Sequence, residues 1–470
     1  MIWQSDHPPV EVGGATLDAM VRATAARVPH RPALVDGSTG DGVTYAELAR
    51  RADRVAALLA ERGLGPGDVL AIWLPNLPVW AGVALGAMRA GVVVTGISPA
   101  ATDRELEAQF EDSGAKLVVT LPGMAARVGA RDVVAVGPEL LSARGPVPSA
   151  NADTALLPYS SGTTGLPKAV AITHRNLSTA VRQFQVALRL SQRDTLIAVA
   201  PFAHIMGFVP NLAVPLAAGT TVVTMPRFDA AGYLELAARH RATVLIGAPP
   251  LMRLLAAAPA LPDVELIVSG GAPLSAELQR VVAARFPRAA VGQGWGMTET
   301  TCGATAPDRE RGTDPGSVGR PMPNTELQLV DGELWVRGPQ VIGDGWLPTG
   351  DAGRIDEDGN VFIVDRLKEL IKVSGYQVAP AELEAVLAGH PAVADAAVIA
   401  RPDERRGEVP VAIVVAAAPV EEAELLAWLG ERVAPYKRPH AVRFAEAIPR
   451  TPSGKVLRRL LRDREPAIVG

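Results

Sequence analysis

The sequence predicts an α/β protein: a large N-terminal domain of layered α/β subdomains with a small antiparallel region, then a smaller α+β C-terminal domain. Apolar runs of strand length alternate with amphipathic stretches of helix length along most of the chain. Near Val330 this pattern gives way to two-residue alternation. The length of 470 residues exceeds what one hydrophobic core usually serves, so at least two domains are expected.

The strands expected in the large domain are continuous runs of Val, Ile and Leu bounded by Gly or Pro. Such runs are typical of strands buried on both faces, and therefore of parallel sheets covered by helices. A helix is predicted over residues 79–90, between strands at 69–73 and 92–94. Further strands of this kind are predicted at 195–199, 221–223, 243–246 and 266–268.

The later part of the chain has a different pattern. Residues 333–337 alternate between apolar and polar, and Asp358-Gly359 is a favourable hairpin turn between strands at 353–356 and 360–364. Antiparallel structure is therefore expected. About a hundred residues follow Asp365, enough for a small domain. We predict helices at 380–387 and 421–433, strands at 394–400 and 409–416, and domains over 1–366 and 367–470.

The composition disfavours several classes of protein. Acidic residues (50) slightly outnumber basic ones (46), and the net charge of −4 argues against a general nucleic-acid surface. The single cysteine, Cys302, excludes a disulfide framework and fits a reducing cytosol. The N-terminus lacks a signal-peptide pattern, and the most membrane-like stretch, 82–97, is short and interrupted by Arg89. We expect a cytoplasmic protein that binds neither nucleic acid nor membrane.

The most informative segment is Tyr159–Lys168, which is rich in hydroxyl groups and glycine and ends in a lysine. Glycines let backbone N–H groups turn toward an anion, Ser and Thr add donors, and Lys168 brings a mobile charge. The segment is not a Walker A motif, because Ala169 follows the lysine where Ser or Thr is required. Most such clusters are plain surface loops, but the apolar runs on both sides favour a polyphosphate site.

This segment resembles the phosphate-binding signature of the adenylate-forming superfamily, which includes acyl- and aryl-CoA synthetases, luciferases and the adenylation domains of peptide synthetases. Four further motifs resemble signatures of this family, in its order, with the strongest likeness to 4-coumarate–CoA ligases: Gly292–Glu299, Thr349–Asp351, Asp365–Lys372 and Pro452–Lys455. The resemblance implies ATP, Mg²⁺ and CoA. A carboxylic acid would attack the α-phosphorus of ATP, and CoA would then displace AMP from the acyl-adenylate. Positioning and charge cancellation accelerate such chemistry.

By resemblance, the nucleotide site draws on every motif. Glu299 would bind magnesium, Thr298 would contact the α-phosphate, and Asp351 would accept hydrogen bonds from the ribose. Taken alone, Asp351 would be a turn aspartate and Trp295 a core aromatic. The nucleotide-binding assignments are Ser160, Ser161, Gly162, Thr163, Thr164, Lys168, Gly271, Ala272, Pro273, Trp295, Gly296, Thr298, Asp351, Arg366, Lys372 and Gln377.

The catalytic cation implied by the resemblance is Lys455, although it could also be one more lysine of a basic tail. Lys368 matches the family's hinge, about which a mobile C-terminal domain rotates between the two half-reactions. Ser374 and Gly375 would then line the CoA path, where relatives often have Lys-Gly. The residues assigned to catalysis are Lys455, Lys168, Thr298, Glu299 and His204.

The acid pocket is also assigned by resemblance. A lone histidine is usually a satisfied core residue, but His204 matches a position that borders this pocket in relatives. The assigned lining is His204, Met206, Val209, Gly270, Gly294, Thr301, Cys302 and Gly303. It is mostly small or apolar, with no basic residue to bind a second carboxylate. We therefore expect an aromatic, phenylpropenoic or medium-chain monocarboxylic acid.

One departure from the family pattern lies between Gly338-Pro339-Gln340 and Gly345-Trp346, where relatives have a longer surface loop. We expect the fold to survive this deletion, with altered interdomain contacts or partner docking.

Other functions stay open beside a CoA ligase. A stand-alone adenylation enzyme would load the pantetheine of a carrier protein. Luciferase-type oxidation and activation of an unusual acid such as nitrite are less favoured on this scaffold. An inactive nucleotide-binding regulator is disfavoured, because Lys168, Glu299, Asp351 and Lys455 are all present.

Overall fold

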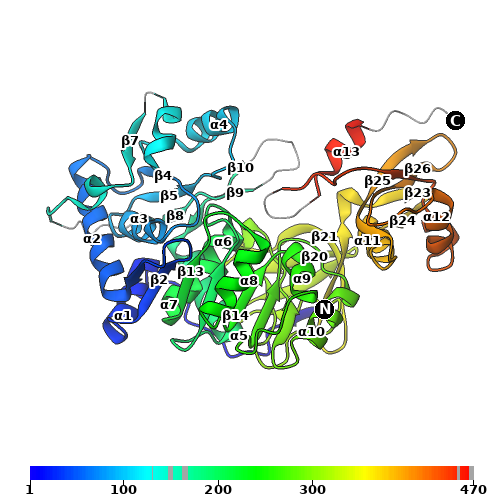
Figure 1. The fold of residues 1–470 in the computed structure, drawn as a ribbon, viewed down its shortest axis with the longest axis horizontal. Coiled ribbons are helices and arrows are strands. Elements are labelled where there is room, and N and C mark those ends of the chain that lie inside the picture. Colours follow the sequence, from blue (N-terminus) through cyan, green and yellow to red (C-terminus); the bar gives the residue numbers. More distant parts are fainter. Residues whose placement is uncertain (130, 147–151, 161–167, 452–455, 465–470) are drawn as a thin grey trace.

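The computed structural model describes residues 1–129, 131–146, 152–160, 168–451 and 456–464 (Figure 1). Its large N-terminal part contains two mainly parallel sheets that share helices, and a smaller antiparallel sheet follows. A separate sheet with its own helices forms the C-terminal part. The fold is therefore the α/β arrangement with an appended α+β region that the sequence predicts.

The first parallel sheet is built from the apolar runs near the start of the chain. Strands β5, β4, β6 and β7 pair in parallel, and β11 closes one edge antiparallel to β8. In spatial order its strands are β11 (Ile172–Thr173), β8 (Thr154–Leu156), β5 (Val93–Gly96), β4 (Val69–Trp73), β6 (Leu117–Thr120) and β7 (Asp132–Ala135).

The second sheet is parallel except for its edge strand β3, which pairs antiparallel with β2. Because β14, β15 and β16 are parallel neighbours, the loops that follow them leave from the same edge of the sheet. In spatial order its strands are β16 (Ala290–Gln293), β15 (Leu266–Ser269), β14 (Val244–Gly247), β12 (Thr195–Ala198), β13 (Thr221–Thr224), β2 (Pro32–Asp36) and β3 (Gly42–Thr44).

Helices fill the space between the two sheets and cover their outer faces. One hydrophobic cluster joins both sheets to α1, α2, α3 and α5, a second packs α8, α9 and α10 on the second sheet, and a third packs α4 on the first. Proline at the first position starts α3 and α9, and Thr102 caps α4 with a capping box. The helices are α1 (Leu17–Arg27), α2 (Tyr45–Glu61), α3 (Pro78–Arg89), α4 (Asp103–Ser113), α5 (His174–Leu188), α6 (Ile205–Phe208), α7 (Val214–Ala218), α8 (Ala230–Arg239), α9 (Pro249–Ala256) and α10 (Ala276–Arg285).

The antiparallel sheet confirms the alternating pattern seen after Val330. Its hairpin strands flank Asp358-Gly359 as predicted, and an N-terminal strand that the sequence did not reveal completes one edge. In spatial order its strands are β1 (Ile2–Gln4), β19 (Glu326–Val330), β20 (Glu333–Arg337), β21 (Leu347–Ile355) and β22 (Val361–Arg366).

The C-terminal region has a hydrophobic cluster of its own, which begins at Ile371. Strands β23, β24, β25 and β26 pair antiparallel, and β27 joins β26 in parallel. Its elements are β23 (Ile371–Val373), β24 (Tyr376–Val378), α11 (Pro380–Ala388), β25 (Val393–Asp403), β26 (Gly407–Ala416), α12 (Glu422–Gly430), β27 (Ala441–Phe444) and α13 (Arg458–Arg464). Throughout the described residues, every helix is too short or too polar to cross a bilayer.

Candidate active site

The two glycine-rich segments assigned to the nucleotide lie at one edge of the second sheet. Ser269 and Gln293 end neighbouring parallel strands and are register partners. The segment Gly271–Pro273 follows the first strand, and Gly294–Gly296 follows the second. The topology therefore brings together two motifs that the sequence keeps apart.

Asp351 is the centre of a hydrogen-bonded cluster. Its side chain is 5% exposed, and its carboxylate pairs with the Arg366 guanidinium at 2.8 Å. The Trp295 indole N–H donates to the same carboxylate at 2.9 Å, and Arg366 also donates to the Thr349 carbonyl at 2.9 Å. An ionised carboxylate only accepts hydrogen bonds, which is the chemistry that the resemblance assigns to Asp351 toward the ribose hydroxyls.

Trp295 has a role that the sequence did not indicate. Its indole fixes the carboxylate of Asp351, which is 56 positions away in the chain. A sequence pattern carries no signal for a contact between a loop residue and a strand residue at such a separation. The structure thus links the tryptophan to the residue that the resemblance assigns to the ribose.

The segment after Trp295 forms a rigid turn around Glu299. Thr298–Thr300 is one turn of 3₁₀ helix, and Thr301 and Cys302 follow with φ of 49° and 86°. Non-glycine residues with positive φ are strained, and such strain is concentrated at functional sites. Behind the turn, the Glu299 carbonyl accepts from the Ile342 N–H at 2.9 Å.

The Glu299 side chain fits a magnesium ligand. It is half-buried, and its carboxylate makes no hydrogen bond or ion pair with any residue that the structure describes. In that part of the chain there is also no cluster of three His, Cys, Asp or Glu side chains able to hold a metal. A single carboxylate together with phosphate oxygens and waters is the usual environment of Mg²⁺ beside a nucleotide.

The phosphate loop is defined by its two ends. Lys168 pairs with Ser160 across the short antiparallel strands β9 (Tyr159–Ser160) and β10 (Lys168–Ala169), and Lys168 is exposed. The chain therefore returns to the point where the loop begins. The predicted residues outside the described part of the chain are Ser161, Gly162, Thr163, Thr164 and Lys455.

Three of the residues assigned to the acid pocket lie together. A Cβ atom on Gly270 would lie 3.6 Å from the Met206 sulfur and 3.7 Å from the Gly294 carbonyl oxygen. His204 caps α6 by accepting from the Met206 N–H at 3.2 Å, and burial lowers its pKa, so the imidazole is neutral at pH 7. Its geometry fixes α6 and gives no indication of acid–base chemistry.

The remaining pocket candidates are held by packing. A Cβ atom on Gly303 would lie 2.5 Å from the Phe184 ring, and the Thr301 hydroxyl donates to the Gln340 carbonyl at 2.6 Å. Val209 is fully buried and begins a π-helical segment, Val209–Ala213, a feature often found at functional sites. Burial raises the pKa of the Cys302 thiol to about 12, so this thiol stays neutral and does not act as a nucleophile.

The candidates on the C-terminal region are exposed. Lys372 and Gln377 lie directly opposite each other on the β23–β24 hairpin, so both point to the same face. Ser374 and Gly375 form the turn between them, with φ of 49° and 85°. Lys368 lies in the 3₁₀ turn Leu367–Glu369 that joins the two regions, where burial lowers its pKa.

Two family models match the chain. The AMP-binding enzyme model matches residues 21–344, and the model of the AMP-binding enzyme C-terminal domain matches residues 382–455. The chain belongs to the AMP-binding enzyme family.

Its curated relatives include 4-coumarate–CoA ligases. Ligase 3 of Oryza sativa subsp. japonica is 37% identical over 99% of this chain and 95% of its own, and ligase 2 of Nicotiana tabacum is 37% identical over 92% and 91%. Among solved structures, ATP-bound MatB from Rhodopseudomonas palustris superimposes with a TM-score of 0.86 at 31% identity, covering 96% of this chain and 99% of its own. The o-succinylbenzoate CoA synthetase of Bacillus subtilis, in complex with its acyl-adenylate, gives 0.84 at 29% identity, covering 95% and 98%.

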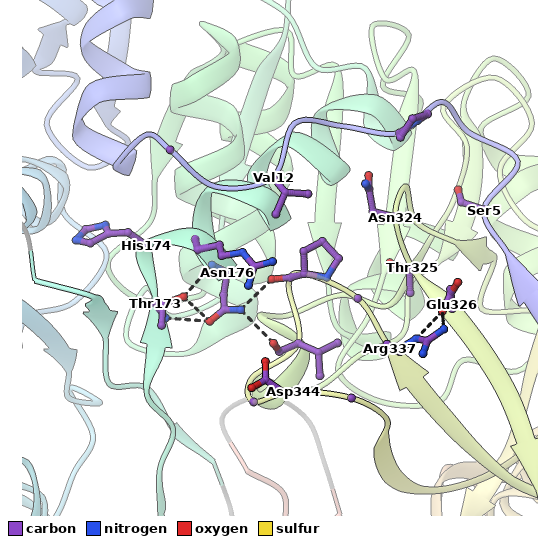
Figure 2. Close-up of a pocket in the computed structure, with 18 of the residues that line it drawn as sticks. Ser5, Val12, Thr173, His174, Asn176, Asn324, Thr325, Glu326, Arg337 and Asp344 are labelled. Carbon is purple, nitrogen blue, oxygen red and sulfur yellow. Dashed lines mark hydrogen bonds and ion pairs between the residues drawn. The ribbon is translucent and has the colours of Figure 1, made fainter.

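A cavity of about 1100 Å³ in this AMP-binding enzyme lies beside the loop at Gly338–Gly345 (Figure 2). The N-terminal segment, the start of α5 and residues Gly338–Gly345 line it, and none of the predicted site residues does. Asn176 holds the short loop against α5 by donating to the carbonyls of Pro339 and Val341 at 2.9 and 3.0 Å (Figure 2). Asn176 thus braces this loop against the start of α5, next to the cavity.

Proposed function

We propose that this AMP-binding enzyme converts an aromatic, phenylpropenoic or medium-chain carboxylic acid to its CoA thioester in two steps. In the first, a carboxylate oxygen attacks the α-phosphorus of ATP, and pyrophosphate leaves. In the second, the CoA sulfur attacks the acyl carbon of the adenylate, AMP leaves, and the thiol proton is released to solvent or a base. ATP and Mg²⁺ serve the first step, and CoA is the second substrate.

Two observations carry this proposal: the Asp351 cluster, and a half-buried Glu299 carboxylate for which the described residues supply no hydrogen-bond or ion-pair partner. A buried carboxylate held by Trp295 and Arg366 is already oriented when the nucleotide arrives, so little reorganisation is needed. Glu299 would place the magnesium ion, which supplies charge neutralisation on the phosphates when bound.

We assign the remaining roles on the same basis. Ser160, Lys168 and the loop between them would hold the phosphates, and Gly271–Pro273 would border the adenine. Lys455 would bridge the acid and the α-phosphate in the first step. The apolar Met206 beside Gly270 supports a flat or extended acid without a second charge.

We further propose domains over 1–366 and 367–470 with a pivot near Lys368. The separate hydrophobic cluster from Ile371 onward and the short turn at Leu367–Glu369 support this division. Rotation there would exchange Lys455 for the face that carries Ser374 and Gly375. A cytoplasmic location without membrane or nucleic-acid partners completes the proposal, on the argument from composition.

The direct test is product analysis. Purified protein is incubated with MgATP, CoA and a mixed panel of carboxylic acids that includes 4-coumarate, cinnamate, benzoate, octanoate and malonate, and the products are identified by mass spectrometry. We expect an acyl-CoA from a monocarboxylic acid, with AMP and pyrophosphate in equal amounts. Malonyl-CoA as the main product would contradict the acid class. No adenylate from any acid would contradict the activity and favour a regulator.

A carrier-protein acceptor is the second candidate function. The altered loop at Gly338–Gly345, with its polar cavity, is the observation that favours it. An acyl-AMP that accumulates although CoA is present, and is consumed when a holo carrier protein is added, would select this alternative.

A further inference from the structure

The base of the loop that carries Lys455 is closed by backbone pairing. Arg450 and Val456 form an antiparallel bridge, and the Leu457 N–H donates to the Pro449 carbonyl at 2.9 Å. The chain therefore leaves and re-enters the C-terminal region at one point. An interaction that holds Arg450 in place therefore also holds the base of this loop in place.

Arg450 is held by Asp395, a residue to which no role has been assigned so far. The guanidinium of Arg450 makes bonds of 2.8 and 3.0 Å from Nη2 to the two carboxylate oxygens, and a third of 3.2 Å from Nε. The Ala396 N–H also donates to Asp395 at 3.0 Å. Such a bidentate arrangement gives a defined geometry and not merely attraction.

The position of Asp395 on its strand is irregular. The register of β25 on β26 shifts between Val393 and Asp395. Such irregularities re-aim the side chain next to them and are frequent beside active sites. Here Asp395 is turned so that it reaches both Arg450 and a residue of the other domain.

That residue is Arg253, on α9 of the large domain. Its Nη2 lies 3.5 Å from the Asp395 oxygen that Arg450 also binds, across 142 positions of the chain. Helix α9 follows β14, the parallel neighbour of β15, and the segment Gly271–Pro273 comes shortly after β15 ends at Ser269. Both α9 and β25 can be followed in Figure 1. Arg253 thus belongs to the part of the large domain that holds the proposed adenine site.

We propose that Asp395 and Arg253 are positioning residues for the first half-reaction: they couple the base of the Lys455 loop to the nucleotide-binding domain. The inference rests on the proposed function. In the second half-reaction the C-terminal domain turns away, so the Arg253–Asp395 contact breaks and the pair has no role there.

The competing explanation is an ordinary surface ion pair. The Arg253 and Asp395 side chains are 45% and 20% exposed, and pairs of this kind contribute little to folding stability. Measuring the two half-reactions separately distinguishes these two explanations from each other and from a third, a purely structural pair. A surface pair affects neither, a structural pair affects both, and a positioning pair affects only the first.

The experiment compares Arg253→Gln, Asp395→Asn, Arg253→Lys and the control Arg241→Gln. Arg241 is also exposed on the large domain and pairs with Asp263 of the same domain at 2.8 Å. The first half-reaction is measured as ATP–pyrophosphate exchange with the most active acid of the panel. The second is measured as thiolysis of the matching synthetic acyl-AMP by CoA.

We expect Arg253→Gln to lower kcat of exchange roughly tenfold and Asp395→Asn up to about a hundredfold, with KM for ATP and the thiolysis rate within about twofold of wild type. Arg253→Lys should restore most of the exchange, and Arg241→Gln should leave both rates unchanged. Normal exchange in both Arg253→Gln and Asp395→Asn, or an equal loss of both half-reactions, would overturn the inference.

Failure of the inference can be told apart from failure of the proposed function. If wild type catalyses exchange and Lys455→Ala does not, the function holds and normal exchange in the Arg253 and Asp395 variants rejects only the positioning role. If wild type catalyses no exchange with any acid, the function and this inference fall together.

Discussion

The large domain and the C-terminal region hold their candidate site residues in different ways. Asp351 is buried and bound by two other candidates, Trp295 and Arg366. On the C-terminal hairpin, Lys372 and Gln377 are exposed and lie opposite each other. Groups that bind the nucleotide in both half-reactions need a fixed geometry, whereas groups that serve one half-reaction must be free to leave. The contrast is what we expect if, as proposed, a preorganised nucleotide domain works with a C-terminal domain that changes its position between the half-reactions.

The largest change in rate is expected from a substitution in the C-terminal domain, at Lys455. We expect Lys455→Ala to lower acyl-adenylate formation by about 10³-fold, because a positive charge is lost where two anions meet in the transition state. Thiolysis of supplied acyl-AMP should stay within about threefold of wild type, since P–O bond formation is already complete. ATP–pyrophosphate exchange and single-turnover thiolysis measure the two steps. An equal loss of rate in both half-reactions would mean that the C-terminal domain does not withdraw Lys455 from the site between them.

A substitution at Asp351, in the large domain, should affect both half-reactions. Asp351→Asn removes the charge that Trp295 and Arg366 bind, and hydrogen bonds to charged groups contribute about 2 kcal/mol, or roughly 30-fold in affinity. We expect KM for ATP and KM for acyl-AMP to rise together. Titration of each ligand in steady-state assays checks this. A rise in only one of them would contradict a nucleotide site shared by the two half-reactions.

A substitution in the proposed acid pocket tests whether the large domain holds this pocket in one fixed shape. A methyl group on Gly270 meets the Met206 sulfur at an ordinary contact distance of 3.6 Å, so Gly270→Ala should fold normally but narrow the pocket. We expect kcat/KM for bulky acids to fall about tenfold relative to short ones, the usual effect of one methyl group. Competition between benzoate and 4-coumarate, followed by mass spectrometry, measures the ratio. An unchanged ratio would remove Gly270 from the pocket.

The smallest effect is expected at the hinge. Lys368→Pro restricts the backbone at the predicted pivot, so we expect the overall rate to fall about fivefold while each half-reaction, measured alone, changes less. Comparison of overall turnover with the isolated steps tests this. A normal overall rate would place the pivot elsewhere.

Much of the fold could be predicted because local patterns determine it. The apolar run at 69–73 corresponds to β4, and Asp358-Gly359 does connect β21 to β22. Proline at position 380 starts α11 as expected. In contrast, β1 is three residues long and depends on pairing with β19, far along the chain, so no local pattern reveals it.

The candidate site divides in the same way. Glycine-rich motifs and single charged residues such as Glu299 could be proposed as site residues from their order in the chain. The bond from Trp295 to Asp351, and the link from Arg253 through Asp395 to Arg450, join residues on separate elements. Only the folded topology brings these partners together. Sequence patterns can therefore suggest individual site residues, but not which of them form hydrogen bonds or ion pairs with each other.

The most direct test of the two-part site compares Lys455→Ala and Asp351→Asn in one assay, the thiolysis of a fixed, subsaturating concentration of acyl-AMP by CoA. We expect Lys455→Ala to react at nearly the wild-type rate and Asp351→Asn to be slower by roughly 30-fold, since only the second variant weakens a group used in both steps. If Lys455→Ala proves the slower of the two, the division into a fixed nucleotide domain and an exchangeable small domain is wrong.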